Sequence, residues 1–130
     1  MSVDERQQSI VEEFNRFSDW EERYGKIIQL GKQLEPMAEE LKTDENLVKG
    51  CQSRVWIHAR LDENKNVVYS ADSDAMIVRG LVAVLLQVYS HASPDEILQT
   101  PPTFLKQLGF ESNLSPSRAN GLYAMVKQIQ

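Results

Sequence analysis

The order of hydrophobic and polar residues predicts a helical start to the chain. Residues 3–17 place Ile10, Val11, Phe14 and Phe17 on one stripe of a helix, with charged and amide residues between them. This spacing is typical of a helix with one buried face. We therefore expect an amphipathic first helix whose apolar stripe packs against the core.

A second helix is expected directly after the first. Ser18 and Glu21 have the spacing of a capping box, in which the serine hydroxyl accepts the backbone N–H of the glutamate, whose carboxylate reaches back. Gly31 is expected to end this helix, and residues 34–41 to form a further short helical piece. Four hydrophobic residues are expected on the inner face of the second helix: Trp20, Tyr24, Ile27 and Ile28.

After a polar connection over residues 42–46, the pattern changes from helical spacing to alternation. One face of the strand expected over residues 53–61 is apolar and carries Val55, Ile57, Ala59 and Leu61. The other face carries Arg54, Trp56, His58 and Arg60. Residues 62–66 are turn formers, and residues 67–71 return as a second strand. The pattern therefore predicts an antiparallel hairpin.

Residues 74–89 form the most hydrophobic stretch and predict a helix that is covered on most sides. Asp72 or Ser73 is expected to cap its N-terminus. Gly80 would let another element approach this helix closely. We expect this helix, packed on the hairpin, to be the structural centre.

Three shorter patterns predict helices in the last third of the chain. Ser93 and Glu96 have the capping-box spacing, with a proline at the first helical position. Residues 104–108 predict a short helix closed by Gly109, and Ser115 is expected to cap the terminal helix. The apolar stripe of that helix consists of Leu122, Met125, Val126 and Ile129. Helices, then a small antiparallel sheet with helices packed on it, then more helices predict an α+β fold.

Composition narrows the class of protein. The length of 130 residues fits a single domain, residues 1–130. The net charge of −5 comes with no basic stripe, so a nucleic-acid partner is not expected. The most apolar run is far shorter than the ~20 residues that span a bilayer, so no membrane partner is expected. With one cysteine and no export signal in the sequence, we expect a cytoplasmic protein.

Cys51 is the only cysteine and carries the most specific candidate chemistry. It follows Gly50, where a sharp backbone turn costs little. A lone thiol closes no disulfide within its chain, but its thiolate can attack or carry a sulfur-linked group. Lys49 and Arg54 would favour the thiolate. The alternative is a buried, inert cysteine. Strand alternation puts Cys51 on the same side as Val55, which fits both a reactive and an inert cysteine.

Other site chemistry has little support in the sequence. His58 and His91 lack metal-binding spacing, and we expect ordinary strand or surface histidines. No phosphate-binding glycine loop, zinc-spaced cysteine pair or nucleophile elbow occurs, and no cofactor or metal is expected. A nucleophilic pair of Cys51 and His58 stays open as an alternative, although no third orienting group can be named.

Residues 50–56 (GCQSRVW) resemble the cysteine loop of the SufE family, the sulfur acceptor proteins of iron–sulfur cluster assembly. Three more segments are similar to family motifs in the same order along the chain. Residues 20–31 resemble the second helix of the family, residues 72–81 the start of its central helix, and residues 114–122 its last-helix signature. The similarity covers nearly the whole chain as one SufE-like domain.

The resemblance implies a SufE/IscU-like fold and a role as helper of a pyridoxal-phosphate cysteine desulfurase. The desulfurase holds sulfur taken from free cysteine as a persulfide. A SufE-like protein accepts that sulfur, stimulates the desulfurase and passes the sulfur to an iron–sulfur scaffold or another recipient. Cys51 occupies the acceptor position, so the resemblance implies a persulfide intermediate there. The resemblance also implies that the cofactor belongs to the partner and that this chain is a carrier and activator, not an enzyme.

Five residues are candidates for shaping the loop or docking the partner: Gly50, Gln52, Ser53, Asp74 and Arg118. Gln52 and Ser53 are expected to shape the loop, and Asp74 and Arg118 to act in docking or electrostatics. Gln52 and Ser53 resemble the branch of the family that serves the stress-type cluster operon, whereas the arginine that follows them resembles a branch with a separate desulfurase. The cognate desulfurase therefore stays open.

Two functions from other classes also stay open. One is a thiol-dependent hydrolase or redox enzyme that uses Cys51 and His58. The other is an interaction module in which the cysteine is only structural.

Overall fold

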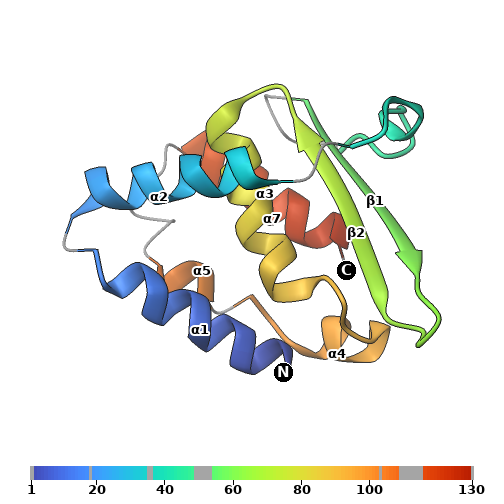
Figure 1. Ribbon diagram of the computed structural model, residues 1–130, viewed down its shortest axis with the longest axis horizontal. Coiled ribbons are helices and arrows are strands. Elements are labelled where there is room, and N and C mark those ends of the chain that lie inside the picture. Colours follow the sequence, from blue (N-terminus) through green and yellow to red (C-terminus); the bar gives the residue numbers. More distant parts are fainter. Residues whose placement is uncertain are drawn as a thin grey trace.

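Helices form both ends of the chain and a hairpin forms its middle (Figure 1). The computed structural model describes residues 2–17, 19–34, 37–48, 54–102, 104–108 and 116–129. Its elements are α1 (Val3–Asn15), α2 (Trp20–Gln33), the 3-10 turn η1 (Glu39–Leu41), β1 (Val55–Leu61), β2 (Val67–Ser73), α3 (Met76–Tyr89), α4 (Pro94–Gln99), α5 (Phe104–Gln107) and α7 (Pro116–Ile129). The predicted α+β architecture is confirmed.

The predicted hairpin is present. β1 and β2 pair antiparallel from Val55 opposite Ser73 to Leu61 opposite Val67. In the connecting turn, the Asp62 carboxylate accepts two backbone N–H groups at 2.9 Å each, which is the usual way that aspartate fixes a tight turn.

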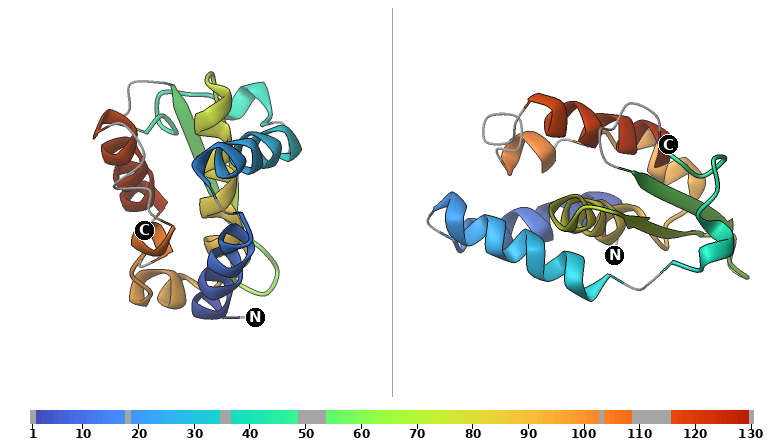
Figure 2. Two further views of the ribbon diagram at one scale, coloured as in Figure 1. Left: turned by 90° about the vertical axis from the view of Figure 1, so that its left-hand side faces the viewer. Right: turned by 90° about the horizontal axis from the view of Figure 1, so that it is seen from above.

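The hairpin and α3 form the middle of the molecule. Seen from above, α7 lies on one side of them and α2 on the other (Figure 2). The Tyr69 hydroxyl of β2 donates to the Ile129 carbonyl of α7 at 3.0 Å. Burying each large aliphatic side chain contributes about 1.5–3 kcal/mol, and α3 buries the largest set, which confirms it as the structural centre. Its buried residues are Val78, Gly80, Leu81, Val82, Ala83, Val84, Leu85, Val88 and Tyr89.

Two glycines let α2 and α3 touch through their backbones. A Cβ atom built at Gly31 would lie 2.8 Å from the Gly80 nitrogen, and one built at Gly80 would collide with the Ile27 carbonyl. Gly80 therefore does what the sequence predicts. The prediction for Gly31 is wrong, because α2 continues to Gln33 and this glycine serves helix contact, not helix termination.

Several predicted caps differ from those observed. The N-cap of α2 is Asp19, whose carboxylate accepts the Glu22 N–H at 2.9 Å; Ser18 lies outside the described residues. The Ser93 hydroxyl accepts the Glu96 N–H as predicted, at 3.3 Å. The Glu96 carboxylate accepts the Val3 N–H of α1, which ties α4 to the start of the chain.

The start of α3 also differs from the prediction. β2 continues through Ser73, and α3 begins at Met76 after an N-cap, Ala75, that has no side-chain hydrogen bond. Ser73 accepts the Ala75 N–H at 3.2 Å within the connection, and Asp72 is engaged elsewhere. A strand that is paired through its last residue keeps both side chains away from the cap position.

Other predictions are confirmed in part. Val55 and Ile57 are buried, but Ala59 is exposed and Leu61 is 60% exposed, because the turn end of the hairpin extends beyond the core (Figure 1). Between Met37 and Leu41 the only helical piece is the 3-10 turn η1. The four residues of the terminal stripe are all buried as predicted. Gly109 and Ser115 lie outside the described residues.

α1 is anchored to the second half of the chain by side chains that bind backbone. The Arg6 guanidinium donates to the Val88 and His91 carbonyls at 3.2 and 3.1 Å and also to the Ser90 carbonyl. The side-chain oxygen of Gln7 accepts the Phe104 N–H at 3.1 Å. The N-terminus of α1 is closed by a capping box at Ser2, which was not among the caps predicted above.

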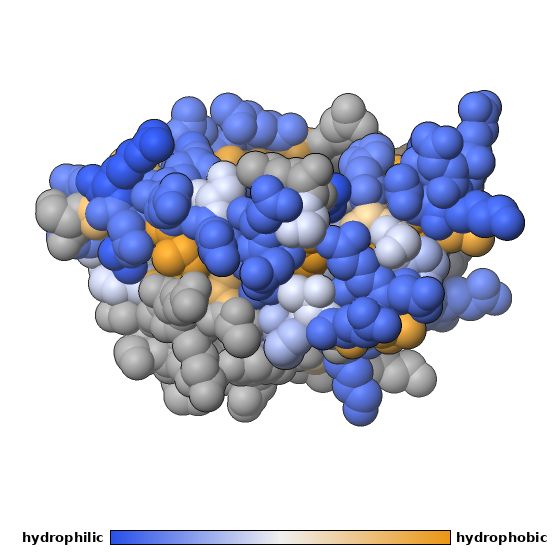
Figure 3. Space-filling view, turned by 90° about the horizontal axis from the view of Figure 1, so that it is seen from below, coloured by the Kyte–Doolittle hydropathy of each residue, from blue (hydrophilic) through white to orange (hydrophobic). Residues whose placement is uncertain are grey.

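The surface is mainly hydrophilic. On the face shown in Figure 3, hydrophobic residues appear as small separate patches. The large hydrophobic side chains that are exposed in the described part are Leu61, Met76 and Leu98. None of the helices described is long and apolar enough to cross a bilayer.

Candidate functional site

Gly50, Cys51, Gln52 and Ser53 lie outside the described residues, but the chain is well fixed on both sides of them. The Val48 N–H donates to the Val55 carbonyl at 2.7 Å. The Ile57 N–H donates to the Asn46 carbonyl at 2.8 Å. Both valines are buried, at 4% and 0% exposure. Residues 46–48 thus run antiparallel to the start of β1, and we call residues 46–48 and 54–55 the stems of the cysteine segment.

Asp74 holds the second stem. Its carboxylate accepts the Arg54 N–H at 3.1 Å, and its own N–H donates to the Arg54 carbonyl at 3.2 Å. Asp74 itself is exposed and stands between β2 and α3. A carboxylate acceptor makes a stronger hydrogen bond than a neutral oxygen does. The backbone immediately after the cysteine segment is therefore fastened to the connection between β2 and α3.

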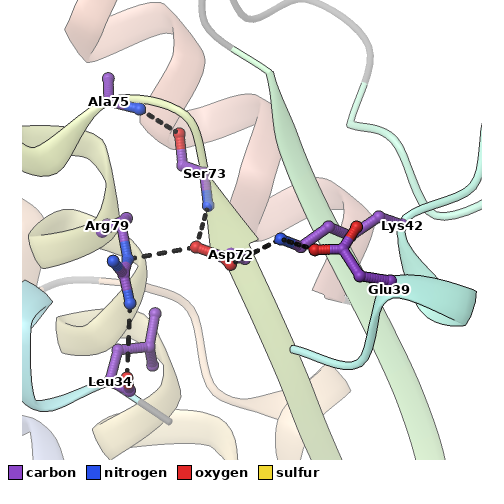
Figure 4. A network of polar contacts seen from close by, with 7 residues as sticks. All are labelled: Leu34, Glu39, Lys42, Asp72, Ser73, Ala75 and Arg79. Carbon is purple, nitrogen blue, oxygen red and sulfur yellow. Dashed lines mark hydrogen bonds and ion pairs between the residues drawn. The ribbon is translucent and has the colours of Figure 1, made fainter. Parts of the chain in front are cut away.

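Asp72 connects the segment that precedes the first stem to β2 and α3 (Figure 4). The residue is only 9% exposed, and its carboxylate forms ion pairs with Lys42 at 3.2 Å and Arg79 at 3.1 Å. It also accepts the Ser73 N–H at 2.8 Å. Arg79 extends the network to the Leu34 carbonyl at 3.4 Å, at the end of α2. One carboxylate thus joins β2, α3 and the segment that follows α2.

Lys42 is the group that brings this segment onto the hairpin. Its ammonium lies 5.7 Å from the centre of the Trp56 ring and also pairs with Glu39 at 3.1 Å. The hydrogen bond to Glu39, followed by the one to Asp72, raises the pKa of Lys42 above its usual range. The lysine therefore keeps its charge at neutral pH and covers the part of the hairpin face where Trp56 stands opposite Asp72.

The role of Lys42 was missed from the sequence, and Asp72 was expected to be a helix cap. A signal was available in part, because strand register predicts that Trp56 and Asp72 share one face of the hairpin. A carboxylate in that position needs a cation if it is buried. The register itself, however, is fixed only by the observed turn.

The structure does not bring all the candidate residues together. Asp74 lies against the second stem. Arg118 belongs to the first turn of α7, and its side chain lies outside the described part. His58 stands on β1 opposite Ser70 and faces a cavity that His91 also lines. Among the residues described, no cluster of histidine, cysteine and carboxylate side chains could hold a metal ion.

Fold and site define an α+β protein whose single cysteine belongs to a short segment fastened at both ends to a hairpin. Residues 8–130 match the model of the SufE family, described as an Fe-S metabolism associated domain. An uncharacterised SufE-like protein of Synechocystis sp. is 46% identical over 121 residues, which are 93% of this chain and 76% of that protein. The chain therefore belongs to the SufE family, which is associated with iron–sulfur metabolism.

A solved structure shows the same fold. The solution structure of a hypothetical protein from Thermus thermophilus matches with a TM-score of 0.79 and covers 96% of this chain and 90% of that one. The two sequences are 22% identical, so the likeness concerns the fold alone.

Proposed function

We propose that this protein is a sulfur acceptor that takes persulfide sulfur from a cysteine desulfurase onto Cys51, stimulates that enzyme and delivers the sulfur for iron–sulfur cluster assembly. The observation that carries the proposal is the pair of fixed stems around the cysteine segment, found in a member of the SufE family. Fixed stems limit where the short segment between them can lie relative to the hairpin. A partner enzyme can then meet the thiol in a reproducible position.

The transfer needs one thiol and no cofactor on this chain. The Cys51 thiolate attacks the outer sulfur of the partner's persulfide, a new S–S bond forms, and the old S–S bond breaks. The partner's cysteine leaves as a thiolate with the electron pair of that bond, and Cys51 keeps the transferred sulfur as a persulfide. Nothing is oxidised or reduced overall. The pyridoxal phosphate that releases sulfur from free cysteine belongs to the partner.

The same exchange in reverse delivers the sulfur. A thiolate of an iron–sulfur scaffold, or of another recipient, attacks the outer sulfur on Cys51 and regenerates the free thiolate. This chemistry fits the cytoplasm, where thiols stay reduced. Small cytoplasmic thiols would also strip an open persulfide, so shelter for the loaded cysteine would preserve it. In this proposal the segment opens at Gly50 when the partner docks, and the bond between Asp74 and Arg54 limits how far it opens.

Intact mass measurement tests the proposal. The protein is mixed with a purified cysteine desulfurase and free cysteine, and we expect a mass increase of one sulfur atom that maps to Cys51. The Cys51→Ser variant should gain no sulfur and should not stimulate the desulfurase. An unmodified wild-type chain in the presence of several loaded desulfurases would contradict the proposal.

The His58→Ala variant separates the proposal from the alternative of a thiol enzyme. His58 faces away from the buried valine of the second stem, so we expect sulfur acceptance close to that of the wild type. A loss of acceptance comparable to that of Cys51→Ser would favour a Cys51–His58 enzyme.

A further inference from the structure

A cavity of about 670 Å³ opens on the polar face of the hairpin, away from the cysteine stems. Its walls are that face, the end of α2, the segment that contains η1, and the second half of α3. None of the stem residues lines it, and neither does Asp74. Its volume falls within the range of roughly 300–1,000 Å³ that is usual for small-molecule sites. The family function proposed above does not use it.

The cavity is polar at one end. His58 and Arg60 project from β1 on the same face as Ser70 and Val68, their partners on β2. The backbone after α3 closes this end, because the His91 N–H donates to the Val67 carbonyl at 2.7 Å. Arg60, opposite Val68, and His91, bonded to Val67, therefore both line the cavity near the start of β2.

The opposite end is apolar. It is lined by Leu30 and Leu34 of the α2 region and by Ala38 and Leu41 from the segment around η1, with the amide of Gln33 as the polar exception. The Lys42–Asp72 ion pair holds this segment against the hairpin. The cavity thus runs from an apolar end beside the ion pair to a cationic end beside the turn of the strands.

The charge of the lining is unlike that of the whole chain. The protein has 19 acidic residues and a net charge of −5, yet no aspartate or glutamate of the described residues lines the cavity. Arg60 forms no ion pair with any described residue. The side chains of His58 and His91 likewise have no hydrogen-bond partner in the described part of the chain. The Arg60 and histidine side chains at this end therefore have hydrogen-bond donors that no described residue accepts. They stand out in a protein whose net negative charge would otherwise repel an anion.

We propose that this cavity binds a small amphiphilic carboxylate. The carboxylate accepts hydrogen bonds from the Arg60 guanidinium, with His58 and His91 beside it, and the hydrocarbon chain lies along Leu30, Leu34 and Leu41. Arginine is the side chain best suited to a carboxylate, since its planar fork can donate two parallel hydrogen bonds. The apolar end removes hydrocarbon from water, which favours binding in proportion to the area covered. The cationic end and the apolar end of the cavity together define the proposed ligand class.

Nuclear magnetic resonance titration of the full chain tests both halves of the proposal. Hexanoate is the probe, with acetate as the control for charge alone and hexanol as the control for hydrocarbon alone. We expect hexanoate to bind saturably and to shift amide signals of lining residues such as Ser70 and Gln87, and acetate and hexanol to bind at least roughly threefold more weakly. Equal binding of hexanol would overturn the anion claim. Absence of saturable hexanoate binding, or shifts confined to other surfaces, would overturn the site.

An arginine pair provides the matched variants. Arg60→Gln removes the charge at the cavity, and we expect hexanoate affinity to fall roughly twofold to fivefold, the upper part of the range for a solvent-exposed ion pair. Arg16→Gln removes the same charge from the exposed end of α1 and should leave affinity unchanged. Equal losses in the two variants would mean that hexanoate responds to net charge and not to this cavity, which would contradict the proposal. Unchanged affinity in Arg60→Gln would contradict it as well.

Discussion

The polar face of the hairpin has two halves that the chain treats differently. In the half nearest the cysteine stems, Trp56 and Asp72 are covered by Lys42 and Arg79. In the half nearest the turn, His58 and Arg60 face a cavity and make no such contacts with the described residues. Both halves belong to the same two strands, so secondary structure does not explain the difference. The difference comes from one carboxylate that recruits cations from two other elements.

The two halves suit different tasks. A site that must present a thiol to a large partner benefits from fixed stems, and next to the covered half the stems are held by hydrogen bonds to β1 and to Asp74. A site for a small ligand benefits from donors without partners, and the open half supplies those. The following substitutions test first the contact between α2 and α3, which we call the frame of both halves, and then each half separately.

The largest effect is expected where α2 and α3 touch. Gly80→Ala places a methyl group against the Ile27 backbone, and overpacking of this kind costs about 3 kcal/mol of unfolding free energy. Gly25→Ala in the same helix pair is the control, because nothing lies within 4 Å of the new methyl group. The control should stabilise the protein by about 0.5–1 kcal/mol. Urea denaturation followed by circular dichroism measures both, and equal effects of the two substitutions would show that the backbones do not touch at Gly80.

The next largest loss of stability is expected in the covered half. Asp72→Asn removes the charge shared by Lys42 and Arg79 at a buried position, so we expect a loss of about 2–3 kcal/mol. Asp44→Asn removes an exposed carboxylate that has no such partners among the described residues and should change stability by less than about 0.5 kcal/mol. Urea midpoints of the two variants check the difference. A stable Asp72→Asn protein would mean that packing alone holds the segment around η1.

A smaller effect is expected at the second stem. Asp74→Ala removes the acceptor of the Arg54 N–H, which is exposed, so the loss of stability should be about 1 kcal/mol. The Cys51 thiol should also react faster with iodoacetamide, because the segment that carries it is held less firmly at that stem. Asp44→Ala is the control. An unchanged alkylation rate in Asp74→Ala would show that this bond does not restrain the cysteine segment.

The smallest effect on stability is expected in the open half. Arg60→Gln removes no ion pair made with the described residues, so the unfolding free energy should stay within about 0.5 kcal/mol of the wild type. Thermal denaturation checks this. A large loss would mean that Arg60 is part of the frame, and the contrast between the two halves would then disappear.

Sequence periodicity was sufficient for the element types and for most of the core. The stripe on α7 and the hairpin follow from spacing alone, because helices and strands bury one face at fixed periods. It was insufficient where one residue had two structural uses. Gly31 has the residue type of a helix stop but serves a helix contact, and Asp72 has the residue type of a cap but serves an ion pair. Tertiary contacts decide between such uses, and they are not visible locally.

In the candidate site, too, some residues could be predicted from the sequence and others depended on tertiary contacts. Cys51 could be singled out because it is the lone thiol, next to a glycine, in a segment that resembles a family loop. Lys42 could not, since a lysine in a polar connection looks like any solvated charge until the register places Trp56 and Asp72 beneath it. The cavity donors were equally hidden, because their convergence depends on how the end of α3 returns to the start of β2.

The anchoring of α1 has a consequence for synthesis in the cell. Arg6 and Gln7 bind backbone groups of residues 88–104, at least 82 positions later in the chain. During translation the first helix therefore leaves the ribosome well before the groups that bind it exist. Until they emerge, its apolar stripe stays open to solvent and to chaperones, as is typical of long-range contacts in nascent chains.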